Sequence, residues 1–229
     1  MFSNDEYAII VAGGTGSRMG NRSPKQFLLL SGKPLLIHSI QAFLDYNPRI
    51  QLVVALHQDY FETWKKICIE HNFHLSHRFV PGGETRYHSV KNALNIIAGE
   101  GFVAVHDGAR PVISKELISL TFRKAREYSN AIPAIPVNET VRTIESGHPR
   151  LVDRNNLRII QTPQVFEIGL LRRAYQQKYL PSFTDDASLL EAQGINLHLV
   201  EGDFRNIKLT YPCDIDIAES YLKSWNDRI

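Results

Sequence analysis

The sequence has few cysteines and no long apolar segment, and both shortages exclude classes of protein. Its 229 residues include two cysteines, Cys68 and Cys213, which lie far apart and do not form the spacing of a metal or redox site. No apolar run approaches the roughly eighteen residues of a membrane-spanning helix, and no segment of signal-peptide type opens the chain. We therefore expect a soluble, cytoplasmic protein without a membrane partner.

A large excess of charge of one sign is also absent. The chain has 26 Lys and Arg residues against 24 Asp and Glu residues, so its charge indicates neither a nucleic-acid partner nor a membrane surface. Its length suits one α/β domain with a substantial core, and we expect residues 1–229 to form a single domain.

Two familiar nucleotide-binding motifs are missing. A P-loop requires the pattern G-x-x-x-x-G-K-S/T, but no Lys-Ser or Lys-Thr pair follows Gly20. The dinucleotide fingerprint G-x-G-x-x-G also fails, since Met19 stands where the third glycine should follow Gly14 and Gly16. A nicotinamide-dependent dehydrogenase is therefore the least favoured interpretation.

The most informative segment that is present runs from Ala8 to Lys25. An apolar run, Ala8 to Ala12, breaks into a loop with glycines at positions 13, 14, 16 and 20. This pattern is typical of a buried strand that ends in a tight turn, where main-chain N–H groups can approach an anion closely. Arg18 and Lys25 add two cations, so the loop predicts a polyphosphate ligand. The alternative is an ordinary strand-to-helix turn with two surface cations.

Strand and helix patterns alternate along the chain. We expect strands near residues 8–12, 52–56, 75–80, 102–105, 131–136 and 197–200. The spacing of apolar residues indicates helices near residues 36–44, 60–68, 87–97, 115–128, 168–175, 189–192 and 217–225. Such alternation is typical of an α/β fold with a mostly parallel sheet and helices on both faces, whose ligands bind at the carboxyl ends of the strands.

Two further turns lie at this predicted edge of the sheet. In the first, Gly83, Glu84 and Ser89 outline a base or ribose pocket, although a plain turn before a capped helix is an equal alternative. In the second, H-D-G-A-R-P, Asp107 follows a strand and is a natural place for Mg²⁺ that is bound to phosphates. Arg110 is suited to a second phosphate, unless it simply pairs with Asp107.

The pattern changes between about residues 137 and 160. Two segments of alternating residues, joined by a turn at residues 146–149, predict a polar β-hairpin arm. An arm of this kind exposes strand edges, and a second subunit is their expected cover. Farther along the chain, Thr184 is a candidate N-cap for the helix near residue 189.

A set of motifs in fixed order carries a resemblance that covers almost the whole chain. The motifs are the glycine loop and the sequences H-D-G-A-R-P, V-D-R-N, Q-T-P-Q, T-D-D-A and N-I-K-L-T. In these the chain resembles the cytidylyltransferases that convert 2-C-methyl-D-erythritol 4-phosphate to its CDP derivative, in the non-mevalonate route to isoprenoid precursors. The resemblance implies a Rossmann-like α/β domain, a protruding β-arm and a homodimer with interlocked arms.

By this resemblance the nucleotide is CTP. Arg18 and Lys25 match residues that hold its phosphates and stabilise the transition state. The residues that match positions around the nucleotide are Ala12, Gly13, Gly14, Gly83, Glu84 and Ser89.

On the acceptor side, Asp107 and Arg110 match residues of the region that binds methylerythritol phosphate and the metal ion. Thr140 and Arg154 lie on the arm and, by resemblance, reach into the neighbouring subunit's site. Arg154 also shares, with Lys208, the task of positioning the attacking phosphate. The residues that complete the pocket are Thr162, Thr184 and Lys208.

The implied reaction is in-line attack of the acceptor phosphate on the α-phosphorus of CTP, with pyrophosphate as the leaving group. It needs cations and alignment more than a general base, because the attacking phosphate is already ionised at neutral pH. Ribitol-5-phosphate cytidylyltransferases share the A-G-G start of the loop, but V-D-R-N and T-D-D-A favour the methylerythritol enzymes. A non-catalytic nucleotide-binding module is the alternative from a different class.

Overall fold

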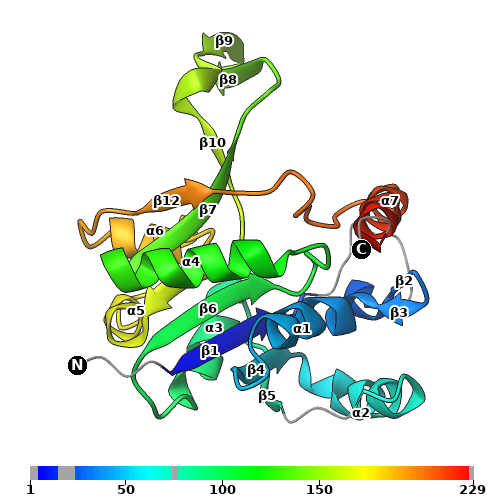
Figure 1. Ribbon diagram of the computed structural model, residues 1–229. Coiled ribbons are helices and arrows are strands. Elements are labelled where there is room, and N and C mark those ends of the chain that lie inside the picture. Colours follow the sequence, from blue (N-terminus) through cyan, green and yellow to red (C-terminus); the bar gives the residue numbers. More distant parts are fainter. Residues whose placement is uncertain (1–4, 15–23, 74–76, 227–229) are drawn as a thin grey trace.

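A β-sheet lies at the centre of the computed structural model, which describes residues 5–14, 24–73 and 77–226 (Figure 1). The strands of this sheet are β1 (Glu6–Val11), β4 (Gln51–Leu56), β5 (Arg78–Pro81), β6 (Phe102–Asp107), β7 (Asn130–Pro136), β10 (Arg158–Ile160), β11 (Gln164–Glu167) and β12 (Leu199–Glu201). Neighbouring strands follow the order β10-β7-β11-β6-β1-β4-β5, and β12 pairs with β7.

Most of the strand pairs that position the site are parallel. β1 pairs in parallel with β4 and with β6, and β4 pairs in parallel with β5. The predicted mostly parallel sheet is therefore confirmed. β11 is antiparallel to both of its neighbours, β6 and β7, and the sequence did not predict it as a strand. Its four residues are too few to show a periodicity, and their conformation depends on pairing such as that of Gln164 with Val105.

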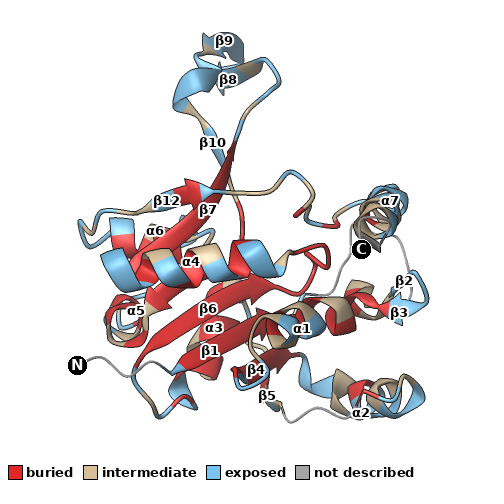
Figure 2. Cartoon of the chain, viewed as in Figure 1, coloured by how far each residue is buried: buried red, intermediate tan, exposed pale blue. Residues whose placement is uncertain are grey.

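Helices cover both faces of the sheet, as the sequence predicted. They are α1 (Leu35–Tyr46), α2 (Phe61–Glu70), α3 (Arg86–Asn95), α4 (Lys115–Tyr128), α5 (Ile168–Ala174), α6 (Ala187–Glu191) and α7 (Asp214–Asn226). Successive β1 side chains point to opposite faces, so Ile10 packs in one cluster with α1 and α4 while Ile9 packs in another with α3 and α5. Figure 2 shows how burial concentrates on the strands and on the helix surfaces that face them. None of the helices in the described ranges is long and apolar enough to cross a membrane.

The carboxyl ends of β1 and β6 lie side by side. Val11 stands opposite Asp107 in their parallel register, and the N–H of Gly108 donates to the carbonyl oxygen of Val11 (2.9 Å). The segments that leave the two strands therefore start next to each other. The remaining short elements are η2 (Lys25–Phe27), β2 (Leu29–Leu30), β3 (Lys33–Pro34) and η3 (Gln58–Tyr60).

A separate hairpin occupies the chain between β7 and β10. Its strands, β8 (Val141–Glu145) and β9 (His148–Val152), pair with each other and, within the described residues, with no other strand. Figure 1 shows the hairpin standing away from the central sheet. The expectation that the second strand continues to residue 160 was wrong. The Asp153 carboxylate accepts a hydrogen bond from the N–H of Asn155 (3.0 Å) and caps a 3-10 turn, η4 (Arg154–Asn156), after which β10 joins β7 in the main sheet.

Candidate active site

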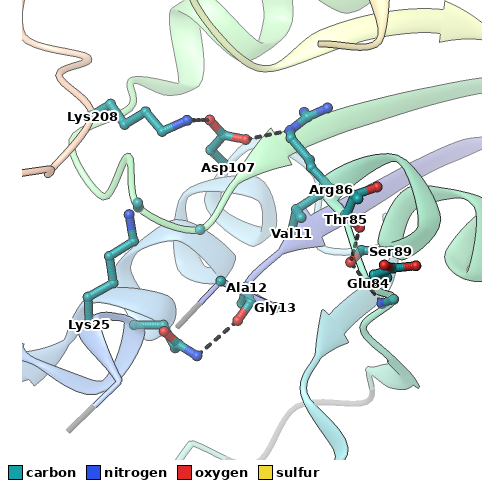
Figure 3. Close-up of a pocket in the computed structure, with 15 residues that line it drawn as sticks. Val11, Ala12, Gly13, Lys25, Glu84, Thr85, Arg86, Ser89, Asp107 and Lys208 are labelled. Carbon is teal, nitrogen blue, oxygen red and sulfur yellow. Dashed lines mark hydrogen bonds and ion pairs between the residues drawn. The ribbon is translucent and has the colours of Figure 1, made fainter. Parts of the chain in front are cut away.

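A cavity of about 200 Å³ lies at the carboxyl ends of β1 and β6, where the start of α3 also meets them (Figure 3). Its walls come from four segments that are distant in sequence: the end of β1 with η2, the turn before α3, the turn after β6, and the loop after β12. The residues that line it are Val11, Ala12, Gly13, Gly14, Lys25, Gln26, Gly83, Glu84, Thr85, Arg86, Ser89, Asp107, Gly108, Ala109 and Lys208. This is the edge of the sheet at which the sequence predicted a ligand.

The fold brings together most of the residues that the sequence singled out. Those on the cavity wall are Ala12, Gly13, Gly14, Lys25, Gly83, Glu84, Ser89, Asp107 and Lys208. Their proximity was expected from the sheet topology, and their individual binding roles stay predictions. Arg18 lies outside the described residues.

The end of the glycine loop is tied to its beginning. Gln26, in η2, is 3% exposed and donates from Nε2 to the carbonyl oxygen of Ala12 (2.9 Å). Ala12 in turn donates its backbone N–H to the carbonyl oxygen of Ala55 on β4 (2.8 Å). Because buried polar groups need partners, these bonds determine where the chain leaves β1 and where η2 lies beside that point. They thereby place Lys25, the neighbour of Gln26, on the cavity wall.

The turn before α3 forms a second wall and is also a helix cap. Gly83 donates its N–H to the hydroxyl of Ser89 (3.0 Å), and Thr85 caps α3 by accepting a hydrogen bond from the N–H of His88 (3.4 Å). A Cβ atom on Gly83 would lie 2.3 Å from that of His88, and one on Gly13 would lie 3.3 Å from the Ser89 hydroxyl oxygen. Glycine is therefore required at position 83, and the approach of the two turns leaves little room for a larger residue at position 13. The sequence left a cap and a cavity wall as alternatives, and one turn makes both.

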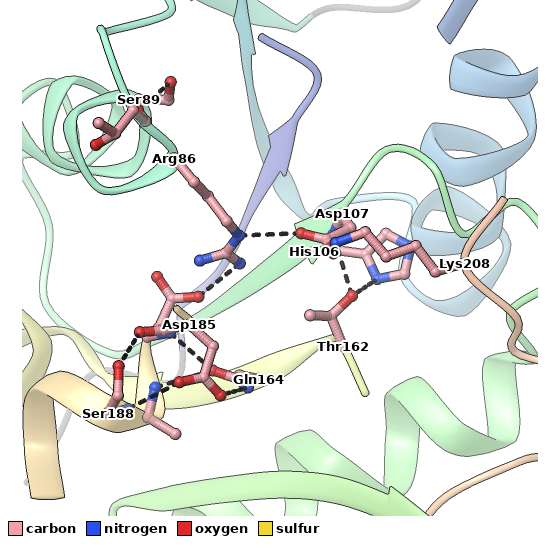
Figure 4. Close-up of polar contacts among 12 residues, drawn as sticks. Arg86, Ser89, His106, Asp107, Thr162, Gln164, Asp185, Ser188 and Lys208 are labelled. Atoms are coloured by element: carbon pink, nitrogen blue, oxygen red, sulfur yellow. Dashed lines mark hydrogen bonds and ion pairs between the residues drawn. The ribbon is translucent and has the colours of Figure 1, made fainter. Parts of the chain in front are cut away.

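Two cations neutralise the buried carboxylate of Asp107. The Arg86 Nε atom lies 3.0 Å from Oδ1, and the Lys208 Nζ atom lies 2.7 Å from Oδ2 (Figure 4). Burial alone would raise the pKa of Asp107, but Arg86, Lys208 and Arg110 together hold this pKa well below its usual range. The carboxylate therefore stays ionised. The simple pair of Asp107 with Arg110 is not what forms, because Arg110 donates from Nη1 to the carbonyl oxygen of Asn206 (2.7 Å).

His106 organises the turn that carries Asp107. The imidazole Nε2 lies 3.1 Å from the carbonyl oxygen of Arg110, and Nδ1 lies 3.1 Å from the hydroxyl oxygen of Thr162. That hydroxyl oxygen also accepts a hydrogen bond from the N–H of Asp107 (3.1 Å). Burial lowers the pKa of His106 to about 4, so the ring is neutral at neutral pH. A neutral ring donates from one nitrogen and accepts at the other, which matches a carbonyl on one side and a hydroxyl on the other.

Five predicted site residues do not line this cavity. Arg110 and Thr162 are buried and hold the turn after β6 in place. Thr140 and Arg154 are exposed at the base of the hairpin, just before β8 and just after β9. Thr184 is exposed in the loop before α6. Their predicted contacts with the acceptor stay predictions.

The proposed N-cap at Thr184 was wrong. The N–H of Ser188, in the first turn of α6, donates to the carboxylate of Asp185 (2.9 Å). Asp185 also accepts a hydrogen bond from the side-chain amide of Gln164 (2.7 Å). The N-cap position of α6 is Asp186, whose side chain makes no capping bond, and the carboxylate of the preceding Asp185 accepts the first-turn N–H instead, as the helix dipole favours.

The carboxylates on the described part of the cavity wall are those of Glu84 and Asp107. Within the described residues, no three His, Cys, Asp or Glu side chains come together as a metal site. Mg²⁺ in nucleotide sites commonly takes one or two carboxylates and completes its shell with phosphates and water. Asp107 fits such an ion once one of its two ion pairs opens. The residues therefore fit a metal ion that arrives with a phosphate ligand, and they do not form a complete protein cage.

Sequence reasoning missed three residues that build the site. Arg86 carried a usable signal, because a cation at the first position of a helix is disfavoured by the helix dipole. Its presence there indicates a nearby negative partner. Gln26 and His106 carried none, since their importance comes from burial and from partners elsewhere in the chain.

Comparison with known proteins agrees with this geometry. The sequence profile of the 2-C-methyl-D-erythritol 4-phosphate cytidylyltransferases matches residues 7–224. The chain belongs to this family. Family members of that name from Phocaeicola vulgatus and Bacteroides fragilis are 47% and 46% identical to it, in each case over 215 residues that cover 94% of this chain and 98% of the relative.

Solved structures of the family have the same fold. The cytidylyltransferase of Thermus thermophilus matches with a TM-score of 0.76 and 32% identity, covering 95% of this chain and 99% of that one. The 4-diphosphocytidyl-2C-methyl-D-erythritol synthase of Anaerococcus prevotii matches with a TM-score of 0.81 and 27% identity over 96% of both chains.

The buried His106 predicts a loss of stability as the pH falls from about 6.5 towards 4. In this range the unfolded chain takes up a proton on this ring and the folded chain does not, so acid favours unfolding. The pKa difference corresponds to at most about 3 kcal/mol in the free energy of unfolding.

Urea unfolding of the wild type, His106→Asn and His57→Asn between about pH 7 and pH 5 measures this effect. The His106 variant should lose part of the pH slope, and the variant of the exposed His57 should keep it. Equal slopes in all three proteins would contradict the prediction.

Proposed function

We propose that this chain transfers CMP from CTP to 2-C-methyl-D-erythritol 4-phosphate, forming 4-diphosphocytidyl-2-C-methyl-D-erythritol and pyrophosphate. One observation carries the proposal: Lys25, Asp107 and Lys208, from three distant motifs, line one cavity at the carboxyl end of the sheet. The acceptor is the one in the family's name. Because CTP is the nucleotide donor, we expect the activity in the cytoplasm.

The proposed chemistry depends on positive charge placed in advance. An oxygen of the acceptor phosphate attacks the α-phosphorus of CTP, the bond to the pyrophosphate oxygen breaks, and negative charge builds on the surrounding oxygens. Lys25 and Lys208 approach the cavity from η2 and from the loop after β12. The two segments touch, since Lys25 Nζ lies 3.4 Å from the carbonyl oxygen of Leu209. Two ammonium groups therefore lie at the cavity wall, and we propose that both bind phosphate oxygens there.

The glycine turns supply the complementary surface for the nucleoside. Ala12, Gly13 and Gly14 on one wall and Gly83 on the other offer backbone groups, with Ser89 and Glu84 beside them. Backbone N–H and carbonyl groups can read the polar edge of a cytosine without large side chains. We assign this part of the cavity to CTP.

Mg²⁺ is the cofactor that we propose, with Asp107 as the residue that would give it an oxygen ligand. A bound Mg²⁺ would neutralise part of the phosphate charge. The residues of the chain act around it: Lys25 and Lys208 bind phosphate oxygens, and the turn built on His106 and Thr162 orients Asp107.

We propose a homodimer in which the hairpin covers the neighbouring subunit. Ile144 and Leu151 are 69% and 68% exposed, and the β8–β9 register places them on one face of the hairpin. Exposed apolar side chains on a projecting hairpin favour cover by a second copy. Thr140 and Arg154 lie at the base of the same hairpin and do not line their own chain's cavity, which supports a role in the partner's site.

Pyrophosphate release by the purified protein with CTP and Mg²⁺ tests the reaction. We expect release with methylerythritol 4-phosphate and none with ribitol 5-phosphate. Release with ribitol 5-phosphate alone would keep the chemistry and change the substrate. No pyrophosphate release with either acceptor would contradict the proposed activity and favour a non-catalytic nucleotide-binding module.

Lys25→Ala should lower kcat on the order of a hundredfold or more, because a preorganised donor to the transition state is lost. The far-ultraviolet circular dichroism should not change. Lys66→Ala, at an exposed lysine of α2, is the matched control and should keep wild-type turnover. Near-normal turnover of the Lys25 variant would contradict its role.

Mixing Arg154→Ala with Lys25→Ala subunits tests the shared site. If the arms exchange, each mixed dimer has one intact site, so random mixing should restore about a quarter of wild-type activity. Mixing Lys25→Ala with Lys208→Ala should restore nothing, since both residues line the cavity of their own chain. No recovery in the first mixture would argue against exchange of the arms.

A further inference from the structure

A chain of ion pairs runs from the buried Asp186 to the cavity, and Arg86 is its central link (Figure 4). Arg86 is the first residue of α3, and its side chain is 24% exposed. Its Nε atom lies 3.0 Å from Oδ1 of Asp107, and its Nη2 atom lies 2.7 Å from Oδ2 of Asp186. One guanidinium thus bridges two carboxylates from β6 and from the start of α6.

The inner end of this chain is fixed by the core. The Asp186 side chain has no exposed surface, and its Oδ1 atom accepts a hydrogen bond from the hydroxyl of Tyr175 (2.6 Å). The backbone N–H of Asp186 donates to the side-chain carbonyl of Gln164 on β11 (3.1 Å). A buried carboxylate is stable only with a partner of opposite charge, so Asp186 holds Arg86 in one place.

The outer end of the chain reaches Lys208 at the cavity. Oδ1 of Asp107 is held by Arg86, which turns Oδ2 towards Lys208 at 2.7 Å. The charges alternate as Asp186, Arg86, Asp107 and Lys208, so a displacement of Arg86 leaves Asp107 without its inner partner. A planar guanidinium with several N–H donors suits this bridge, and an ammonium group suits it less well.

We propose that Arg86 is a positioning residue that is anchored by Asp186, fixes the orientation of Asp107 and, through Asp107, holds Lys208 at the cavity. This inference rests on the proposed transfer reaction, because Asp107 and Lys208 are assigned to the acceptor side of that reaction. Asp186 does not line the cavity, so it acts on the reaction only through Arg86.

Kinetic constants for both substrates in Arg86→Gln and Asp186→Asn test the proposal. We expect kcat/KM for the acceptor to fall about tenfold to a hundredfold in Arg86→Gln, because a small displacement of catalytic groups has effects of this order. Asp186→Asn should also lower kcat/KM for the acceptor. KM for CTP should change less than about threefold in both variants. Arg86→Lys should recover part of the loss. The proposal would be overturned if KM for CTP rose by as large a factor as kcat/KM for the acceptor fell. It would also be overturned if the kinetic constants for the acceptor did not change.

A double variant separates positioning from plain structural support. Arg86→Gln leaves Asp186 buried without a cation and should lower the temperature of thermal unfolding. Adding Asp186→Asn removes that buried charge, so the double variant should recover stability while its activity stays low. Recovery of activity together with stability would show a merely structural role and overturn the proposal. Arg126→Gln, which breaks the ion pair with Glu6 at the amino end of β1, is the matched control and should leave the kinetic constants unchanged.

Crystal structures of the wild type and Arg86→Gln without ligands give a readout that needs no turnover. We expect the Asp107 carboxylate to rotate and the Lys208 ammonium to leave the cavity wall in the variant. If both side chains keep their positions, the proposal fails even when the wild type is active. If the wild type is inactive with every acceptor but the side chains move as expected, the proposed function fails and the positioning role stands.

Discussion

The structure of the site depends on one buried carboxylate, that of Asp107 at the end of β6. A charge in this environment needs partners of opposite sign, and Arg86 and Lys208 provide them from α3 and from the loop after β12. Three segments that are distant in sequence therefore meet at one side chain. The cavity exists where they meet, so the ion pairs define the site as much as the sheet does.

The sheet makes this meeting possible. Because β1 and β6 are parallel neighbours, Val11 and Asp107 stand side by side, and the loops that follow them open at the same edge. His106 points into the core one residue before Asp107 and holds the turn through Arg110 and Thr162. The Asp107 carboxylate is thus oriented from both sides, by the turn below it and by the ionic chain beside it. Transfer of CMP benefits from such rigidity, since groups that are already in place need not reorganise during the reaction.

The residues that the family's motifs single out do not all lie in one place. One group lines the cavity, and another, Thr140 and Arg154, lies at the base of a hairpin that stands away from the sheet, while Arg110 and Thr162 are buried beside the cavity. A single chain does not bring the two groups together. The proposed dimer gives this division a physical reason, because a hairpin with exposed Ile144 and Leu151 can gain stability and complete a neighbouring site by the same contact.

The sequence alone determined the α/β class, the parallel core of the sheet and most helices, because each depends on a local periodicity of apolar residues. It also determined that the turns after β1 and β6 and before α3 meet, because their glycines and charged residues follow predicted parallel strands. It did not determine β11, the break between β9 and β10, or the cap at Asp185, where few residues and a single side-chain contact decide the conformation. Nor did it show that Arg110 and Thr162 are buried.

Only the tertiary structure assigned partners to charges. Asp107 pairs with Arg86 and Lys208 and not with its sequence neighbour Arg110, and Arg86 reaches Asp186 across 100 residues of sequence. Periodicity predicts which face of an element is buried, and it says nothing about which buried charges will meet. That choice follows from the order of strands in the sheet and from the need of each buried charge for a partner of opposite sign.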